Sequence, residues 1–180
     1  MNHITKPAVV ICFISLLFSS CQRNMIKKIM TEFVKSEINI PEDLRCVYNR
    51  EISVIDEDAL KEYKLIVYYD SLECSSCRVS HISDIYPLYA MADTSNFSVI
   101  TIFSPRQTDL EDVELQLNLA NHPVPIYLDI NKTFCLSNLQ IPQDPRFHVF
   151  LIDGKGVPVF VGNPLANVKL EQLFQSALRE

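Results

Sequence analysis

The sequence predicts an α/β fold: a central mixed β-sheet flanked by helices, with an N-terminal extension of helix and strand. Apolar runs of strand length alternate with stretches of helical spacing between residues 65 and 129. Residues 149–161 then form two strand-like runs joined by a short turn. Strands joined by helices run parallel, whereas a tight turn makes neighbours antiparallel, so the predicted sheet is mixed.

The core elements follow from these periods. We expect buried strands at residues 65–70, 98–103 and 124–129, because each is a short apolar run. Helices are expected between them, at residues 77–91 and 109–118. No internal repeat or low-complexity segment interrupts the pattern.

Proline and glycine mark the remaining boundaries. Pro87 lies within the first helix and should kink it or end its first half. Residues 153–156 form the turn between strands at 149–152 and 157–161. The final helix, residues 167–178, should turn one apolar face inward. That face comprises Val168, Leu170, Leu173, Phe174 and Leu178.

The residues before the core are less regular. Residues 22–38 carry apolar side chains at helical spacing and are either an amphipathic helix or a partly ordered tether. Residues 44–48 suggest a short strand, and the polar residues 53–64 a turn or short helix.

The first twenty residues have the pattern of a targeting signal. Lys6 precedes an apolar run at 8–18 that is short for a membrane span. Phe18-Ser19-Ser20-Cys21 resembles a bacterial lipobox, with Phe18 where leucine is usual. This resemblance implies cleavage before Cys21 and lipid attachment to it; the alternative is an ordinary secretory peptide with an incidental cysteine.

Three segments are therefore expected: a lipoprotein signal peptide (1–20), a tether and extension (21–59) and one domain (60–180). The 180-residue chain has a net charge of −6, which becomes −7 when Lys6 is removed with the signal. An acidic chain without a basic patch is not expected to bind nucleic acid. Membrane attachment would come from the lipid alone, and no cofactor or metal is indicated.

One motif, a pair of closely spaced cysteines, has the residues for a chemical reaction. Cys74-Ser75-Ser76-Cys77 follows a strand-like run and precedes a helix, so its two sulfurs lie within disulfide reach. The helix N-terminus favours a thiolate there. A zinc site would need a second pair of soft ligands, but Cys46 and Cys135 stand alone. A C-x-x-C between a strand and a helix is typical of thioredoxin-like redox proteins.

Residues 60–180 resemble the thioredoxin-fold envelope lipoproteins of the TlpA/ResA-like class. The resemblance rests on the run from Leu65 to Cys77 and on Phe150-Leu151-Ile152-Asp153-Gly154-Lys155-Gly156-Val157-Pro158-Val159, which is similar to the family's F-L-I-D-x-x-G-x-V hairpin. It implies a thiol–disulfide oxidoreductase of the bacterial envelope, with its domain in the periplasm. The implied partners are envelope protein thiols and disulfides, and a membrane thiol-reducing system as electron donor.

The chain departs from this family at two positions. Glu73 replaces the tryptophan that usually precedes the first cysteine. Phe147 occupies the place of the family's cis-proline, with Pro145 two residues earlier. Either an insertion shifts Pro145 into that role or the cis-proline is missing, which puts the substrate-binding loop in question.

The two cysteines of the motif are expected to have different roles in disulfide exchange. Cys74 would be the exposed attacking thiolate, and Cys77, one turn inside the helix and less exposed, the resolving thiol. The alternative is a static disulfide, although so short a loop would add little stability. A carboxylate at Glu73 disfavours the Cys74 thiolate and so favours a reductant, unless Glu73 points to solvent.

The other histidines and cysteines have either a functional or a purely structural role. His148 follows the suspected proline position and is either a proton carrier or copper ligand near the disulfide, or a buried histidine satisfied by neighbours. His81 is expected at the surface, and Asp129 as a strand-end cap. Cys46 and Cys135 either pair or remain separate apolar residues.

Three other functions compete with this one. A peroxiredoxin resembles P-x-x-x-T-x-x-C, but Val67 and Ser71 occupy its proline and threonine positions. A copper-delivery protein of the Sco type would have C-x-x-x-C. A non-catalytic, lipid-anchored interaction module is favoured by the missing tryptophan and displaced proline, and disfavoured by the presence of both motif cysteines.

Overall fold

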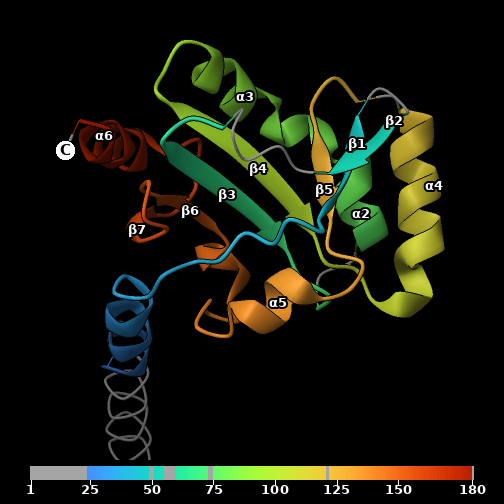
Figure 1. The fold of residues 1–180 in the computed structure, drawn as a ribbon. Coiled ribbons are helices and arrows are strands. Elements are labelled where there is room, and N and C mark those ends of the chain that lie inside the picture. Colours follow the sequence, from blue (N-terminus) through green and yellow to red (C-terminus); the bar gives the residue numbers. More distant parts are fainter. Residues whose placement is uncertain (1–23, 49–50, 55–59, 73–74, 121, 180) are drawn as a thin grey trace, which may run out of the picture.

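A seven-stranded mixed sheet, with strand order β2-β1-β5-β4-β3-β6-β7, forms the centre of the molecule. β3 (Tyr63–Tyr69) and β4 (Phe97–Phe103) lie parallel in its middle (Figure 1). β5 (Ile126–Leu128) continues the parallel part beside β4, and β6 (Val149–Ile152) pairs antiparallel with β3. The computed structural model describes residues 24–48, 51–54, 60–72, 75–120 and 122–179.

The outer strands complete the sheet at both ends. β7 (Pro158–Val161) forms the predicted hairpin with β6. β1 (Arg45–Tyr48) pairs antiparallel with β5, and β2 (Glu51–Val54) with β1. Parallel strands joined by helices, followed by a terminal hairpin and helix, give the thioredoxin-like arrangement that the sequence predicts.

The expectation of a turn or short helix over residues 53–64 is wrong at both ends. Ser53 and Val54 belong to β2, and Tyr63 and Lys64 to β3. The run from Glu51 to Val54 alternates polar and apolar residues, which is the strand period. Pairing with β1 satisfies its backbone groups.

The helix expected at residues 77–91 is broken into three parts. They are α2 (Ser75–Ser80), a 3-10 helix (Ile82–Ile85) and α3 (Tyr86–Asp93). Pro87 lies in the first turn of α3, where its missing N–H costs no helical hydrogen bond, so the proline begins a helix rather than bending one.

Two of the remaining helices agree with the prediction and one was missed. α4 (Leu110–Ala120) follows β4, and α6 (Val168–Ala177) is capped by Asn167, whose Oδ1 accepts from the Leu170 N–H at 3.0 Å. α5 (Thr133–Ser137), directly after β5, was not expected.

The inward face predicted for the last helix is only partly right. Phe174 is fully buried, with its ring edge-on to Phe97 and Phe160 at centroid distances of 5.0 and 5.4 Å. Val168 and Leu173 are instead 68% and 50% exposed. Packing is centred on Phe174, so the buried stripe is narrower than the apolar pattern suggests.

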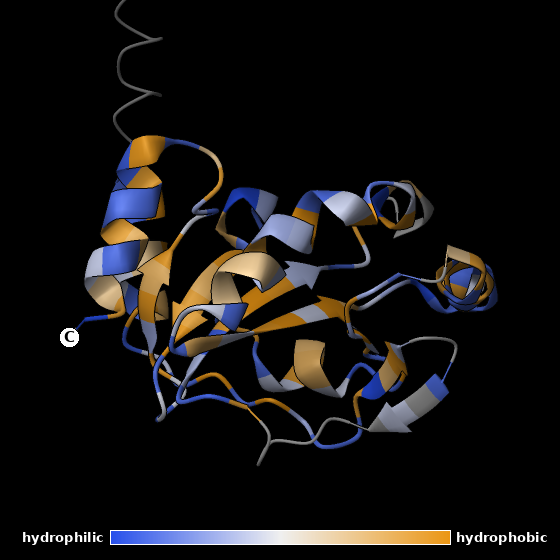
Figure 2. Cartoon of the chain, turned by 90° about the horizontal axis from the view of Figure 1, so that it is seen from above, coloured by the Kyte–Doolittle hydropathy of each residue, from blue (hydrophilic) through white to orange (hydrophobic). Residues whose placement is uncertain are grey.

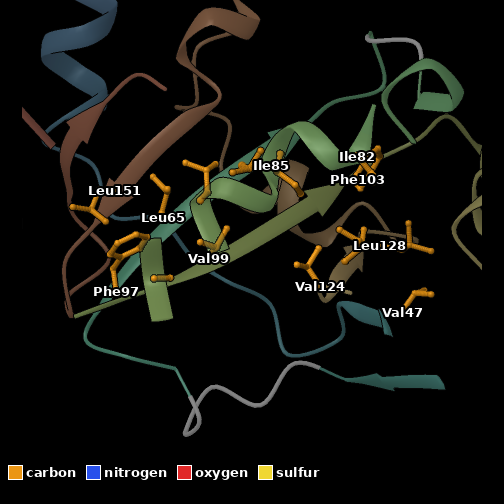
Figure 3. Close-up of a cluster of buried hydrophobic side chains, with 14 of the residues drawn as sticks. Val47, Leu65, Ile82, Ile85, Phe97, Val99, Phe103, Val124, Leu128 and Leu151 are labelled. Atoms are coloured by element: carbon orange, nitrogen blue, oxygen red, sulfur yellow. The ribbon is translucent and has the colours of Figure 1, made fainter. Parts of the chain in front are cut away.

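Two hydrophobic clusters lie on opposite faces of the sheet, because successive side chains of a strand alternate between faces. One cluster joins Leu65, Val99 and Leu151 to α3, α4 and α6 (Figure 3). The other joins Ile66 and Phe150 to α5 and the N-terminal segment. The hydrophobic central strands are orange in Figure 2, between the two sets of helices.

The N-terminal segment packs onto this second cluster. Residues 24–33 are helical, and the fully buried Phe33 ring meets Phe150 edge-on at 5.1 Å. Farther along, the Ile38 N–H donates to the Gly156 carbonyl at 2.8 Å. In the part of the chain that the structure describes, no helix is long and apolar enough to cross a membrane.

The close approach at Gly156 predicts a stability effect. Its φ is +79°, and an added Cβ would lie 2.7 Å from the Ile38 carbonyl oxygen. We expect Gly156→Ala to lower the free energy of unfolding by about 1–3 kcal/mol in urea titrations. Gly154→Ala is the control, since its Cβ would meet only the flexible Glu62 side chain, at 3.2 Å from Cγ. Equal losses in both variants would contradict the strain argument.

Candidate functional site

The structure brackets the cysteine motif between β3 and α2. β3 ends at Tyr69 and α2 begins at Ser75, while Glu73 and Cys74 lie outside the described residues. Cys77 lies in α2 and is disulfide-bonded. Its partner also lies outside the described residues, because the other described cysteines, Cys46 and Cys135, are both free.

Cys77 is expected to be less exposed than Cys74, and of these two cysteines the structure describes Cys77. Cys77 is exposed because α2 turns Val79, which is 4% exposed, toward the core instead. The next residue, Arg78, places its guanidinium carbon 5.5 Å from the Tyr69 ring centroid. The residue after Cys77 therefore places a positive charge over the last tyrosine of β3. The exposure of Cys77 relative to that of Cys74 remains a prediction.

Two hollows are lined by described residues that come shortly before or after the motif in the sequence. The first, of about 260 Å³, is lined on the motif side by Arg78 and His81. The second, of about 290 Å³, is lined on the motif side by Ser71 and Leu72. Across from these residues the first hollow has Pro145 and Asn163, and the second has Cys135 and Leu139. Tyr68 and His148 line both hollows, so they form the wall between them.

His148 is a buried residue with close neighbours. It is 2% exposed, its Nε2 lies 2.8 Å from the Pro142 carbonyl oxygen, and its ring centroid lies 5.1 Å from that of Tyr68. Its own carbonyl accepts from the Tyr68 N–H at 2.9 Å. These contacts favour the histidine satisfied by its neighbours. Among the described residues, no group of three or more His, Cys, Asp or Glu side chains could hold a metal ion.

Pro145 begins a 3-10 helix, Pro145–Phe147, beside the first hollow. The described residues contain no cis peptide bond, so Pro145 does not take the cis-proline role. Asp144 caps the turn, with Oδ1 accepting from the Arg146 N–H at 3.1 Å. The Arg146 guanidinium, hydrogen-bonded to the same carboxylate, lowers the pKa of Asp144 to about 2.

Asp129 does more than cap its strand. It is 1% exposed, and Oδ2 accepts from Ser104 Oγ at 2.9 Å and from the Cys135 N–H at 3.1 Å. Oδ1 accepts from the Phe134 N–H at 3.1 Å and from Thr133 Oγ1 at 3.3 Å. The carboxylate therefore caps α5 and ties it to the loop after β4. Asp129 shortly before Thr133 is a helix-start signal that could have revealed α5.

A polar network extends from Asp129 to the second hollow. Lys132, in the left-handed conformation with φ of 61°, donates from Nζ to the Ser104 carbonyl at 2.8 Å and also to the Pro105 carbonyl. Burial lowers the pKa of Lys132. Burial raises the pKa of Tyr68 far above its usual value, and the neighbouring Cys135 side chain raises it further. Sequence reasoning missed this network because its members come from three distant segments.

The network predicts that Asp129 is important for stability. We expect Asp129→Ala to lower the free energy of unfolding by about 3 kcal/mol, because the donors that it satisfies stay buried without an acceptor. Asp43→Ala is the control: that carboxylate, also bonded to Thr133 at 2.7 Å, is exposed, and its loss should cost under about 1 kcal/mol. Urea unfolding measures both, and a near-neutral Asp129→Ala would show that the network adds nothing.

Of the other histidines and cysteines, His81 lines the first hollow and Cys135 the second, whereas His122 and Cys46 line neither. His81 is exposed, as expected, at the end of α2. His122 is buried with Nδ1 2.6 Å from the Val124 carbonyl oxygen, and burial lowers its pKa. Cys46 is 6% exposed in β1, where burial raises the pKa of its thiol. Cys46 and Cys135 do not pair. Cys21 lies outside the described residues.

Comparison with known proteins finds similarity in structure alone. No family model and no curated protein matches the chain. An uncharacterized thioredoxin-like protein from Porphyromonas gingivalis aligns with a TM-score of 0.44 and 17% identity, covering 79% of this chain and 91% of its own. Mycobacterium tuberculosis AhpC aligns with a TM-score of 0.45 and 13% identity, covering 81% of this chain and 99% of its own.

Proposed function

We propose that this protein is a thiol–disulfide oxidoreductase that works through a Cys74–Cys77 disulfide. The observation that carries the proposal is that Cys77 is disulfide-bonded in a helix that begins just beyond β3. Cys74 is the proposed partner because cysteines three residues apart at a helix start lie within disulfide reach. The order of strand, motif and helix is that of thioredoxin-like redox proteins.

The reaction would run in two exchange steps. The Cys74 thiolate attacks a disulfide of the substrate protein, forming a mixed disulfide and releasing one substrate thiolate, which takes up a proton. The Cys77 thiolate then attacks the Cys74 sulfur, which releases the second substrate thiolate and leaves the Cys74–Cys77 disulfide. The substrate gains two electrons, and an envelope thiol-reducing system would return the motif to the dithiol.

The setting of this reaction is also a proposal. Cys21 would carry the lipid that holds the domain at a membrane of the bacterial envelope, on the periplasmic side. Envelope proteins with disulfides would then be the substrates. Exported thiols are oxidised in that compartment, so a reductant there needs an electron supply. Resemblance to the TlpA/ResA-like class, seen in residues 65–77 and 150–159, supports this assignment.

A second candidate is a non-catalytic interaction module with the same fold. It is favoured by the substrate-loop position, where Pro145 is not cis and Phe147 occupies the expected proline place. In that case the disulfide of Cys77 would be a static link.

The direction of electron flow depends on Glu73. A carboxylate next to Cys74 disfavours its thiolate, which makes the reduced form less stable and lowers the reduction potential. We therefore expect redox titration against glutathione to give a potential near that of thioredoxin, roughly −270 mV. Glu73→Gln should raise the potential, whereas Glu171→Gln, an exposed substitution on α6, should not. A potential near roughly −120 mV would make the protein an oxidant.

A further inference from the structure

A third hollow, of about 460 Å³, lies between the N-terminal helix, residues 24–33, and the segment after α5 (Figure 1). The apolar side chains around it include Met25, Ile26, Ile29, Leu139 and Phe147. Met25 is 58% exposed and Leu139 is 79% exposed. Exposed apolar side chains that gather around one hollow mark a surface that binds another apolar surface.

Hydrogen bonds hold the two walls of this hollow together. The Asn39 N–H donates to Asn138 Oδ1 at 2.8 Å, and Asn138 Nδ2 donates to the Asn39 carbonyl at 2.8 Å. Gln140 Nε2 donates to the Glu37 carbonyl at 2.9 Å. These bonds, with the buried Phe33 ring at the end of the helix, fix the helix against the segment after α5. The exposed apolar side chains therefore belong to one fixed face.

The helix side of this face is positively charged, although the chain is acidic. Residues 24–36 carry three lysines and one glutamate, a net charge of +2, whereas the whole chain carries −6. Lys27 and Lys28 are exposed. On the opposite wall Asp144 and Arg146 form an ion pair and neutralise each other. An exposed apolar face bordered by lysines complements a bilayer whose headgroups are anionic.

The position of this face in the chain favours the same partner. Met25 is the second residue that the structure describes, and Cys21, the proposed lipid site, comes four residues earlier in the sequence. Four residues span no more than about 15 Å. A lipid on Cys21 would therefore hold the hollow next to the membrane surface.

We propose that this face binds the surface of an anionic phospholipid bilayer. The face comprises Met25, Lys27, Lys28, Ile29, Leu139 and Phe147. The proposal rests on the proposed function, which places the domain at an envelope membrane, and it adds a second attachment made by the folded domain itself. The apolar side chains would enter the boundary between headgroups and acyl chains, and the lysines would meet the phosphates. Two attachments would hold the domain in one orientation, so its substrates would be protein disulfides near the membrane surface.

Hydroxyl-radical footprinting of the full-length chain in vesicles tests the proposal, because the radicals oxidise side chains that solvent reaches. The vesicles are phosphatidylcholine alone or phosphatidylcholine mixed with phosphatidylglycerol, and mass spectrometry measures the oxidation of Leu139 and Phe147. We expect both side chains to be oxidised several-fold less in the anionic vesicles. Leu139 is far from the anchor in sequence, so anchoring alone does not protect it. Equal oxidation in the two kinds of vesicle would overturn the proposal.

Variants show which side chains cause the protection. Lys27→Glu combined with Lys28→Glu should return the oxidation of Leu139 to its level in neutral vesicles, since each lysine near an anionic surface strengthens binding about fivefold. Leu139→Gln should restore the oxidation of Phe147. Leu119→Gln is the matched control and should not, because Leu119 is a comparably exposed leucine, at 71%, on α4. Circular dichroism checks that each variant is folded.

The same samples separate this proposal from its rivals. Protection that depends on the number of chains per vesicle, and not on phosphatidylglycerol, would mean that a second copy covers the face and would overturn the proposal. The double lysine variant should reduce a soluble protein disulfide at the wild-type rate, since neither lysine lines a hollow near the motif. If the wild type reduces that disulfide but Leu139 is not protected, only the membrane face is refuted. If the wild type does not reduce it, the proposed function fails.

Discussion

Replacing Cys74 with serine is expected to reduce disulfide exchange to the uncatalysed background. The proposed nucleophile is the Cys74 thiolate, and a serine hydroxyl is not ionised at neutral pH and does not attack disulfides. The assay is reduction of a protein disulfide by the purified chain, with glutathione present to return the motif to its reduced form. Cys46→Ser is the matched control and should retain the wild-type rate, because Cys46 is buried in β1 and away from both hollows.

Two results would count against this expectation. If Cys74→Ser kept the wild-type rate, the attacking sulfur would be another cysteine. If the wild type itself did not exceed the background, the interaction-module alternative would gain support. A binding module should also keep its partner after Cys74→Ser, whereas an exchange enzyme loses turnover.

Removal of the Phe33 ring is expected to have the largest effect on stability. Phe33 is fully buried and meets the fully buried Phe150 edge-on at 5.1 Å. It joins the N-terminal segment to the second hydrophobic cluster, with Ile66, Tyr68 and Phe134. Phe33→Ala should therefore lower the free energy of unfolding by about 3–5 kcal/mol. Urea unfolding followed by circular dichroism measures the loss.

Val34→Ala is the control for this variant, because its side chain is adjacent in sequence but 39% exposed. It should change the free energy of unfolding by no more than about 0.5 kcal/mol. If Phe33→Ala were equally mild, the N-terminal segment would be an appendage and not part of the core.

The central elements were predictable because their sequences carry a strong period. Residues 65–69 form a continuous apolar run and residues 167–178 an amphipathic one, and both formed the expected element. β2 and α5 have local signals, the strand period of Glu51–Val54 and Asp129 before α5, but four or five residues are too few for such signals to be decisive. Long-range contacts decide such short elements: β1, the partner of β2, is held in the sheet by β5, and Phe134 of α5 packs in the second hydrophobic cluster.

The candidate site was predictable only where its residues are neighbours in sequence. Cys74 and Cys77 are three residues apart, so a local motif reveals them. Tyr68, Ser104, Lys132 and Cys135 meet because β3, β4 and β5 are adjacent in the sheet. That proximity depends on strand order, which the linear sequence does not display. In the sequence Cys135 is an isolated cysteine, and only the fold places it in the hollow that Ser71 and Leu72 also line.

The most direct test of the Cys74–Cys77 centre is disulfide mapping of the wild-type chain in glutathione buffers of graded potential. Peptides prepared without reduction should show Cys77 linked to Cys74 under oxidising conditions. Both cysteines should become free in one reversible transition as the buffer becomes more reducing, while Cys46 stays free throughout. A Cys77 linked to another cysteine, or a link that does not respond to the buffer, would contradict a redox-active pair.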